Sequence, residues 1–194
     1  MTRVYRQLAE APVPVWLSEG DGEPEIGDAP IIELFRSLEP VNGQQWIAFR
    51  GTSIERLPAV LRNGVDVEPT DAPIYCADPD KASEYAKPGF GQSGPGLLMA
   101  FHGGHLDQSF RILPADASSA EITEVERFYP HLHRYPDGRM WFTRFSDSAS
   151  AYEIEYGYWI PGSARDALLA IFLLGQEDEL IEAIATVTSA AASS

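Results

Sequence analysis

Short apolar runs alternate with loops rich in glycine, proline and acidic residues along most of the chain. Runs of about four to eight apolar and branched residues are typical of strands, and glycine or proline commonly bounds them. Glu153 and Glu155 lie two residues apart in the last such run, so they share one face of that strand. The pattern predicts strands over 44–51, 73–77, 97–103, 109–113, 139–145 and 151–160, and a looser edge segment over 4–17.

Helical signals lie between these runs. Residues 53–64 keep apolar side chains at helical spacing and end with Gly64, a residue that favours a helix C-terminus. Asp78 is the expected N-cap of a helix over 79–86, because Pro79 suits the first helical position. Further helices are predicted over 31–40, 118–129, 163–175 and 176–187.

Short, mostly antiparallel strands with helices early and late predict an α+β fold in a single domain. The 194 residues contain no internal repeat and no evident domain boundary. We divide the chain into an N-terminal segment (1–45) with an acidic loop (18–30), a core (46–162), and a C-terminal helical segment with a frayed tail (163–194).

Composition and charge narrow the choice of partners. The formal net charge is −15 and the pI is about 4.5, so the surface repels phosphate backbones and anionic membranes. Nucleic-acid binding is therefore disfavoured, whereas a basic protein partner or a small anionic ligand in a local positive site is compatible with this charge. The N-terminus lacks an apolar signal core, and the longest apolar run, 167–175, is too short to cross a bilayer. We expect a soluble, cytoplasmic protein in which Cys76, the single cysteine, is a small buried side chain.

Three segments carry candidate chemistry. The first is WIAFRGT (46–52), a strand that runs into the start of a helix. The second is IYCADPDKASEYA (74–86), which reads as a strand, a cap and a helix. The third is EIEYGYWI (153–160), a strand with two glutamates on one face.

The order of these segments resembles the ADP-ribosyltransferase family, which spans bacterial toxins and poly-ADP-ribose polymerases. Arg50-Gly51-Thr52 matches the first element of that family, and Tyr75 with the Ala-x-x-Tyr of 82–85 matches the second. The resemblance covers about 46–160 and gives a mixed Arg-Tyr-Glu pattern, since members with this tyrosine element usually begin with His-Gly-Thr. It implies two small, mainly antiparallel sheets that form an NAD cleft flanked by helices.

The resemblance also implies that NAD is the substrate and that its nicotinamide ring has two aromatic walls. Tyr75 and Tyr85 would be these walls, because a flat, electron-poor pyridinium is attracted to aromatic faces. Gly51 would let backbone groups approach the carboxamide of the ring.

The remaining assignments concern charge. Arg50 would offer a planar cation to the pyrophosphate or the ribose of NAD, with Thr52 in the same binding set. By the Glu-x-Glu pattern of the family, Glu155 would be the catalytic carboxylate, and Glu153 would help to activate an acceptor. The implied activity is ADP-ribosyl transfer to an unknown acceptor, or NAD glycohydrolysis when the acceptor is water.

Other interpretations stay open at this stage. The chain could be non-catalytic, either a degenerate NAD-binding member or an acidic partner-binding protein, because Glu-x-Glu in an acidic chain is also typical of a solvated strand face. A metal-dependent hydrolase is a third hypothesis, since all four histidines occur in close pairs and imidazoles bind transition metals. These pairs are His102 with His105, near Asp107, and His131 with His133; none has helical spacing, so no metal site is assigned. Rival carboxylates lie on a predicted helix: Glu121, Glu124 and Glu126.

Overall fold

The structure is a computed structural model that describes residues 3–10, 12–20, 24–66, 74–87, 94–108, 116–120, 122–123, 132–134, 140–142, 156–160 and 163–192. Its strands are β1 (Val4–Ala9), β2 (Val15–Glu19), β3 (Ile47–Ser53), β4 (Ile74–Cys76), β5 (Gly96–His102), β6 (Asp107–Gln108), β7 (Leu132–Arg134), β8 (Met140–Phe142), β9 (Tyr156–Trp159) and β10 (Leu168–Leu174). Its helices are α1 (Ala29–Ser37), α2 (Leu57–Asn63), α3 (Pro79–Ala86), α5 (Ala164–Ala167) and α6 (Ile181–Ala191). Short 3-10 turns are η1 (Ile54–Arg56), η2 (Gly103–His105) and η3 (Glu177–Leu180).

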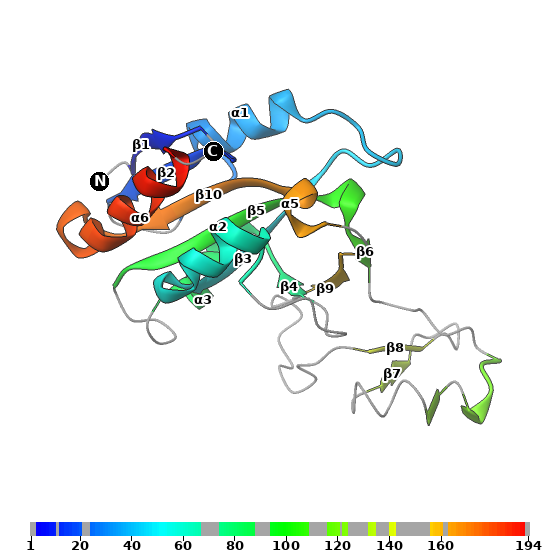
Figure 1. Cartoon of the computed structure of the whole chain (residues 1–194). Coiled ribbons are helices and arrows are strands. Elements are labelled where there is room, and N and C mark those ends of the chain that lie inside the picture. Colours follow the sequence, from blue (N-terminus) through cyan, green and yellow to red (C-terminus); the bar gives the residue numbers. More distant parts are fainter. Residues whose placement is uncertain are drawn as a thin grey trace.

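Five strands form an open sheet in the order β1-β2-β10-β5-β3 (Figure 1). Neighbouring strands in this sheet are antiparallel, except that β10 runs parallel to β2. The predicted α+β class with mostly antiparallel strands is therefore confirmed. The sheet is larger than the small sheets that the family resemblance implies.

Helices cover both faces of this sheet. One apolar cluster joins the sheet to α2 and α6, and a second joins it to α1 and α3. Every residue of β5 is buried, and full burial of a large apolar side chain contributes about 1.5–3 kcal/mol. Alternate residues of β5 belong to the two clusters: Leu97, Met99 and Phe101 to the first, Leu98 and Ala100 to the second.

The predicted helix over 163–175 is wrong for most of its length. Only α5 is helical there, and the run 168–174 is β10, which lies between β2 and β5 inside the sheet. This run, LLAIFLL, is almost wholly buried. A continuous apolar run has no periodicity that distinguishes a strand from a buried helix. Hydrogen bonding to β2 on one edge and β5 on the other makes this run a strand. Gly175, with a φ of 136°, ends it.

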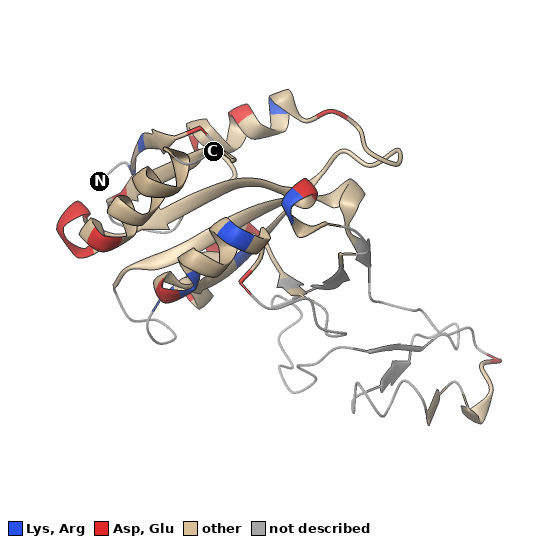
Figure 2. Ribbon diagram, in the orientation of Figure 1, with Lys and Arg blue, Asp and Glu red and all other residues tan. Residues whose placement is uncertain are grey.

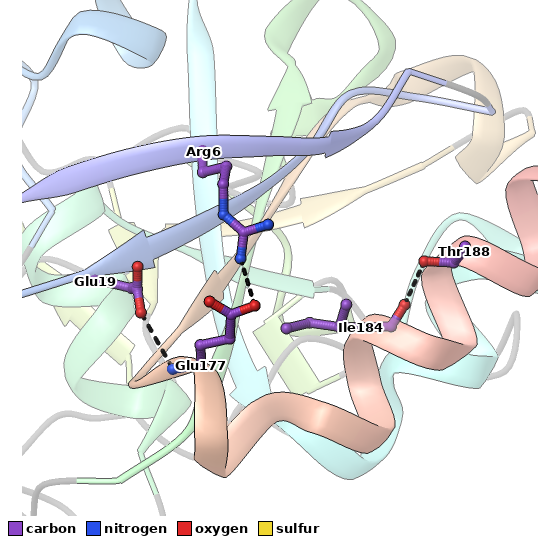
Figure 3. A network of polar contacts seen from close by, with 5 residues as sticks. All are labelled: Arg6, Glu19, Glu177, Ile184 and Thr188. Carbon is purple, nitrogen blue, oxygen red and sulfur yellow. Dashed lines mark hydrogen bonds and ion pairs between the residues drawn. The ribbon is translucent and has the colours of Figure 1, made fainter.

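Both chain ends contribute to the same part of the sheet. The segment predicted over 4–17 includes β1 and β2, and the helix predicted over 176–187 is present as η3 and α6. Figure 3 shows how these elements meet: Arg6 Nη2 lies 2.8 Å from Glu177 Oε1, and the Glu177 backbone N–H donates to Glu19 Oε1 at 3.2 Å. The ion pair is about half exposed, so it adds little free energy and mainly sets the position of the turn before α6.

A three-stranded antiparallel sheet, β4-β9-β6, lies next to β3. One isolated bridge joins it to the large sheet. The Phe49 N–H donates to the Ala77 carbonyl oxygen at 3.1 Å, and the Ala77 N–H donates to the Phe49 carbonyl oxygen at 2.8 Å. β7 and β8 form a separate antiparallel pair.

Most other local predictions are confirmed where the structure describes the chain. The helix predicted over 53–64 is η1 followed by α2, and Gly64 ends it with a φ of 82° while its N–H donates to Val60 at 2.7 Å. The helix over 79–86 is α3, with Pro79 first. The strands predicted over 44–51, 73–77, 97–103, 139–145 and 151–160 overlap β3, β4, β5, β8 and β9. The strand predicted over 109–113 and most of the helix over 118–129 lie outside the described residues.

Acidic residues gather at the turn before α6, whereas η1 and α2 carry the basic residues Arg56 and Arg62 (Figure 2). Among the described helices, none has the length and apolar character needed to cross a membrane.

Two glycines let α3 pack directly on the sheet. A Cβ added to Gly51 on β3 would lie 1.7 Å from the Ala82 carbonyl oxygen, and one added to Gly96 on β5 would lie 2.8 Å from the Ala86 carbonyl oxygen. Both distances are far below van der Waals contact, so α3 rests on the sheet through backbone atoms.

Replacing Gly51 with alanine should lower the free energy of unfolding by about 3 kcal/mol or more, because the methyl group forces α3 away from β3. Gly27→Ala is the matched control, since nothing lies within 4 Å of its Cβ position. This control should change the free energy of unfolding by less than about 0.5 kcal/mol. Urea unfolding followed by circular dichroism measures both, and equal midpoints would contradict the packing of α3 on Gly51.

Candidate functional site

The two sheets part immediately after the bridge between β3 and β4. In antiparallel register Arg50 faces Cys76, and the next positions that could exchange backbone hydrogen bonds, two residues beyond Phe49 and Ala77, are Gly51 and Tyr75. The bridge is isolated, so Gly51 and Tyr75 occupy facing register positions without pairing. They therefore lie where the backbones of β3 and β4 separate.

The backbone of Gly51 presents a donor and an acceptor at this point. Phe49 directs its N–H and C=O to Ala77, so its pair with Ala100 on β5 is a non-hydrogen-bonded pair. The bonding direction alternates along a strand, and Gly51 therefore turns its N–H and C=O to the same edge as Phe49, away from β5. Neither group has a hydrogen-bond partner among the described residues, and Gly51 is only half-buried.

Tyr85 lies on α3, the helix that packs on Gly51. The helix contacts Gly51 through backbone atoms of Ala82 and Ala86, and Tyr85 immediately precedes Ala86. Tyr85 is 41% exposed, unlike the aromatic residues of the core. Lys81 Nζ lies 5.6 Å from the centroid of the Tyr85 ring and 2.9 Å from Glu84 Oε2. The ring of Tyr85 is therefore accessible, and its face already attracts a cation.

Arg50 lies on the other face of β3. Its Nε donates to Asp66 Oδ1 at 2.7 Å and its Nη2 donates to Asp66 Oδ2 at 2.9 Å. The Arg50 side chain is 17% exposed and the Asp66 side chain 4%. Asp66 follows α2, whereas Gly51 faces α3, and neighbouring strand residues point to opposite faces. The structure thus separates the Arg50 guanidinium from Tyr85 by the thickness of the strand.

Cys76 lies near this ion pair on β4. Burial raises the pKa of its thiol from 9.0 to about 12, an effect that the positive charge of Arg50 opposes and the negative charge of Asp66 reinforces. The prediction of a small buried side chain is confirmed, since Cys76 is 3% exposed.

The glutamates of the third motif lie outside the described residues. β9 begins directly after Glu155, and its first residue, Tyr156, pairs with Cys76 of β4. The strand of the third motif is therefore a direct neighbour of the strand of the second. The Glu153 and Glu155 side chains, and that of Tyr75, are not among the described groups.

Thr52 is half-buried on β3, opposite Leu97 of β5. It follows Gly51 in sequence and shares the face of Arg50, because alternate residues of a strand point the same way. The Arg50-Gly51-Thr52 motif is thus divided between the α2 face and the α3 face of one strand.

The first histidine pair is engaged in the fold. His102 is buried; its Nδ1 accepts from the Gly104 N–H at 2.9 Å, and its Nε2 lies 2.7 Å from the Glu39 carbonyl oxygen. Both ring nitrogens are therefore occupied in the neutral tautomer that donates from Nε2. The His105 ring packs edge-on at 5.5 Å. In the described part of the chain, no group of three or more His, Cys, Asp or Glu side chains could hold a metal ion.

Several rival candidates lie outside the described side chains: His131, His133, Asp107, Glu121, Glu124 and Glu126. The residue that sequence reasoning missed is Asp66. It follows the helix-ending Gly64 and the buried Val65, and nothing in this local pattern points to a partner sixteen positions earlier on β3.

Comparisons of the chain with protein-family models, with curated proteins and with solved structures find no match.

Native Cys76 should react with iodoacetamide at pH 8 far more slowly than the same residue in the urea-unfolded chain. A thiol pKa of about 12 in place of 9.0 lowers the thiolate fraction by about a thousandfold, and burial adds a steric barrier. The native rate should rise as the pH approaches 12 until the chain unfolds. Mass spectrometry of the adduct follows both reactions, and similar rates in the two states would contradict the burial of Cys76.

Proposed function

We propose that the chain is an ADP-ribosyltransferase of the family that its motifs resemble, and that NAD binds in a cleft where β3 and β4 separate. The observation that carries this proposal is the open backbone edge of Gly51, opposite Tyr75 in register and next to α3, which bears Tyr85. All three motifs lie on neighbouring elements, because β4 is joined to β3 by a bridge and to β9 by a ladder.

The groups at this edge suit the nicotinamide of NAD. A primary amide has one carbonyl acceptor and two N–H donors, and the N–H and C=O of a single strand residue complement both kinds of group. Gly51 offers this pair at a register position where β3 and β4 are not paired. The cationic pyridinium ring would stack on Tyr85, whose face attracts the Lys81 ammonium in the structure, and on Tyr75.

Cleavage of the nicotinamide–ribose bond depends mainly on a negative charge that stabilises the transition state, and a carboxylate supplies it. The bond between the anomeric carbon and the ring nitrogen breaks, its electron pair moves to the nitrogen, and neutral nicotinamide leaves. Glu155 stabilises the positive charge that develops on the ribose and binds its 2′-hydroxyl. An acceptor oxygen or nitrogen then bonds to the anomeric carbon, and its proton passes to Glu153 or to water. With water as the acceptor, the same steps give NAD glycohydrolysis.

Arg50 and Thr52 complete the proposed NAD-binding set from the other face of β3, where the guanidinium would hold the pyrophosphate. A protein is one candidate acceptor of the ADP-ribose, and water is another. A single buried thiol suits a reducing compartment, and we place the reaction in the cytoplasm.

A second candidate follows from the same ion pair. Arg50 is paired with the nearly buried carboxylate of Asp66. Such a pair is also found where an arginine only supports the fold and binds no ligand. In that case the chain would be a non-catalytic member that binds NAD, or an acidic protein that binds a basic partner.

The test is nicotinamide release from NAD by the wild-type protein and by Glu155→Gln. The substitution should lower the rate by about a hundredfold or more, because it removes the charge that stabilises the transition state, while NAD affinity changes little. Glu182→Gln, an exposed change on α6 that alters net charge equally, should keep the wild-type rate. Wild-type protein that binds NAD without releasing nicotinamide would favour the non-catalytic candidate, and protein that does not bind NAD at all would overturn the proposal.

A further inference from the structure

The Arg50–Asp66 pair has a geometry that fixes the plane of the guanidinium. Asp66 accepts from two nitrogens of Arg50, at 2.7 and 2.9 Å, so the arginine can neither rotate about its terminal bonds nor move along the strand. A monodentate contact, or a lysine in place of the arginine, would leave such freedom.

The backbone just before Asp66 is fixed by contacts of α2 with α5. The N–H of Gly64 closes α2 on Val60, and a Cβ on Gly64 would lie 2.4 Å from the Arg165 backbone nitrogen. Arg165 in turn donates through Nε to the Arg62 carbonyl oxygen at 2.7 Å. α2 and α5 therefore hold the backbone at Gly64, two residues before Asp66.

Stability alone is a weak reason for this pair. Taking two charges out of water is costly, and apolar residues of similar volume in place of a buried ion pair often leave stability unchanged or raise it. The neighbourhood of the pair offers apolar surroundings, since Met99 pairs with Arg50 across β5 and Cys76 is buried beside it. A charged pair at this place therefore points to a role for the orientation of the arginine.

We propose that Asp66 is a positioning residue, which holds the Arg50 guanidinium in the orientation that binds the phosphates of a dinucleotide at the β3 edge. This inference rests on the proposed function, because the bound molecule is taken to be NAD. Asp66 itself touches no part of the substrate. It makes the phosphate contact more favourable by restricting the arginine before the substrate arrives.

The experiment compares two probes, NAD and nicotinamide riboside, which keeps the ring and its ribose but has no phosphate. Titration calorimetry or ligand-observed NMR measures both affinities for the wild type and for Asp66→Asn. The variant should bind NAD about tenfold more weakly, the worth of one charge-assisted hydrogen bond, and should bind nicotinamide riboside as the wild type does. Asp116→Asn, an exposed change of the same charge, should leave both affinities unchanged.

A double variant, Arg50→Met with Asp66→Leu, keeps the test valid if Asp66→Asn unfolds. It replaces the ion pair by apolar side chains of similar size, so its circular dichroism spectrum should show a folded protein. Its affinity for NAD should fall, whereas its affinity for nicotinamide riboside should equal that of the wild type. The inference is overturned if either folded variant binds NAD as tightly as the wild type, or if both probes weaken equally. Failure of the proposed function looks different, because the wild type would then bind neither probe.

Discussion

The contact between Gly51 and α3 is the constraint on which the candidate site depends. The helix lies on β3 at a distance that only a hydrogen on Cα permits. The same contact sets how far Tyr85 stands from the strand, because Tyr85 is adjacent to the helix residues that touch Gly51. The amide edge of Gly51 is perpendicular to this contact and stays open toward β4. Gly51 therefore determines the position of α3 on the sheet and also supplies the backbone N–H and C=O groups where β3 and β4 separate.

β3 thus offers three separate surfaces within two neighbouring residues. Arg50 points to the α2 face, Gly51 has its Cα against α3, and the backbone edge between them faces β4. A ligand that spans a flat ring and a pyrophosphate needs contacts of different kinds along its length. An edge strand suits such a ligand, because its backbone groups are not all used by the sheet and its side chains reach both faces. The central strands β5 and β10 have no comparable edge to offer.

Elements whose sequence signals are local could be predicted. Gly64 after a helical pattern and Pro79 after Asp78 are short-range features, and the helices α2 and α3 lie where these features predict them. β10 could not be predicted, because an apolar run of this length becomes a strand only when β2 and β5 are there to pair with it. The role of Asp66 could not be predicted either, because its partner on β3 is fixed by tertiary packing and by no spacing within the motif. The strand and helix that carry Arg50, Gly51 and Tyr85 could therefore be predicted from sequence, but the carboxylate that binds the arginine could not.

Asp66 also bears on the mixed motif pattern. Where the motif resembles the tyrosine-bearing branch of the family, histidine is usual at the position of Arg50. An arginine that is only 17% exposed keeps its charge at all physiological pH values, so it needs a fixed carboxylate to offset the loss of solvent. Asp66 supplies that carboxylate with two hydrogen bonds, a geometry that the ring of a histidine does not match. The arginine and the aspartate are thus one unit, and a change from arginine to histidine would leave Asp66 buried with half of its bonds unmade.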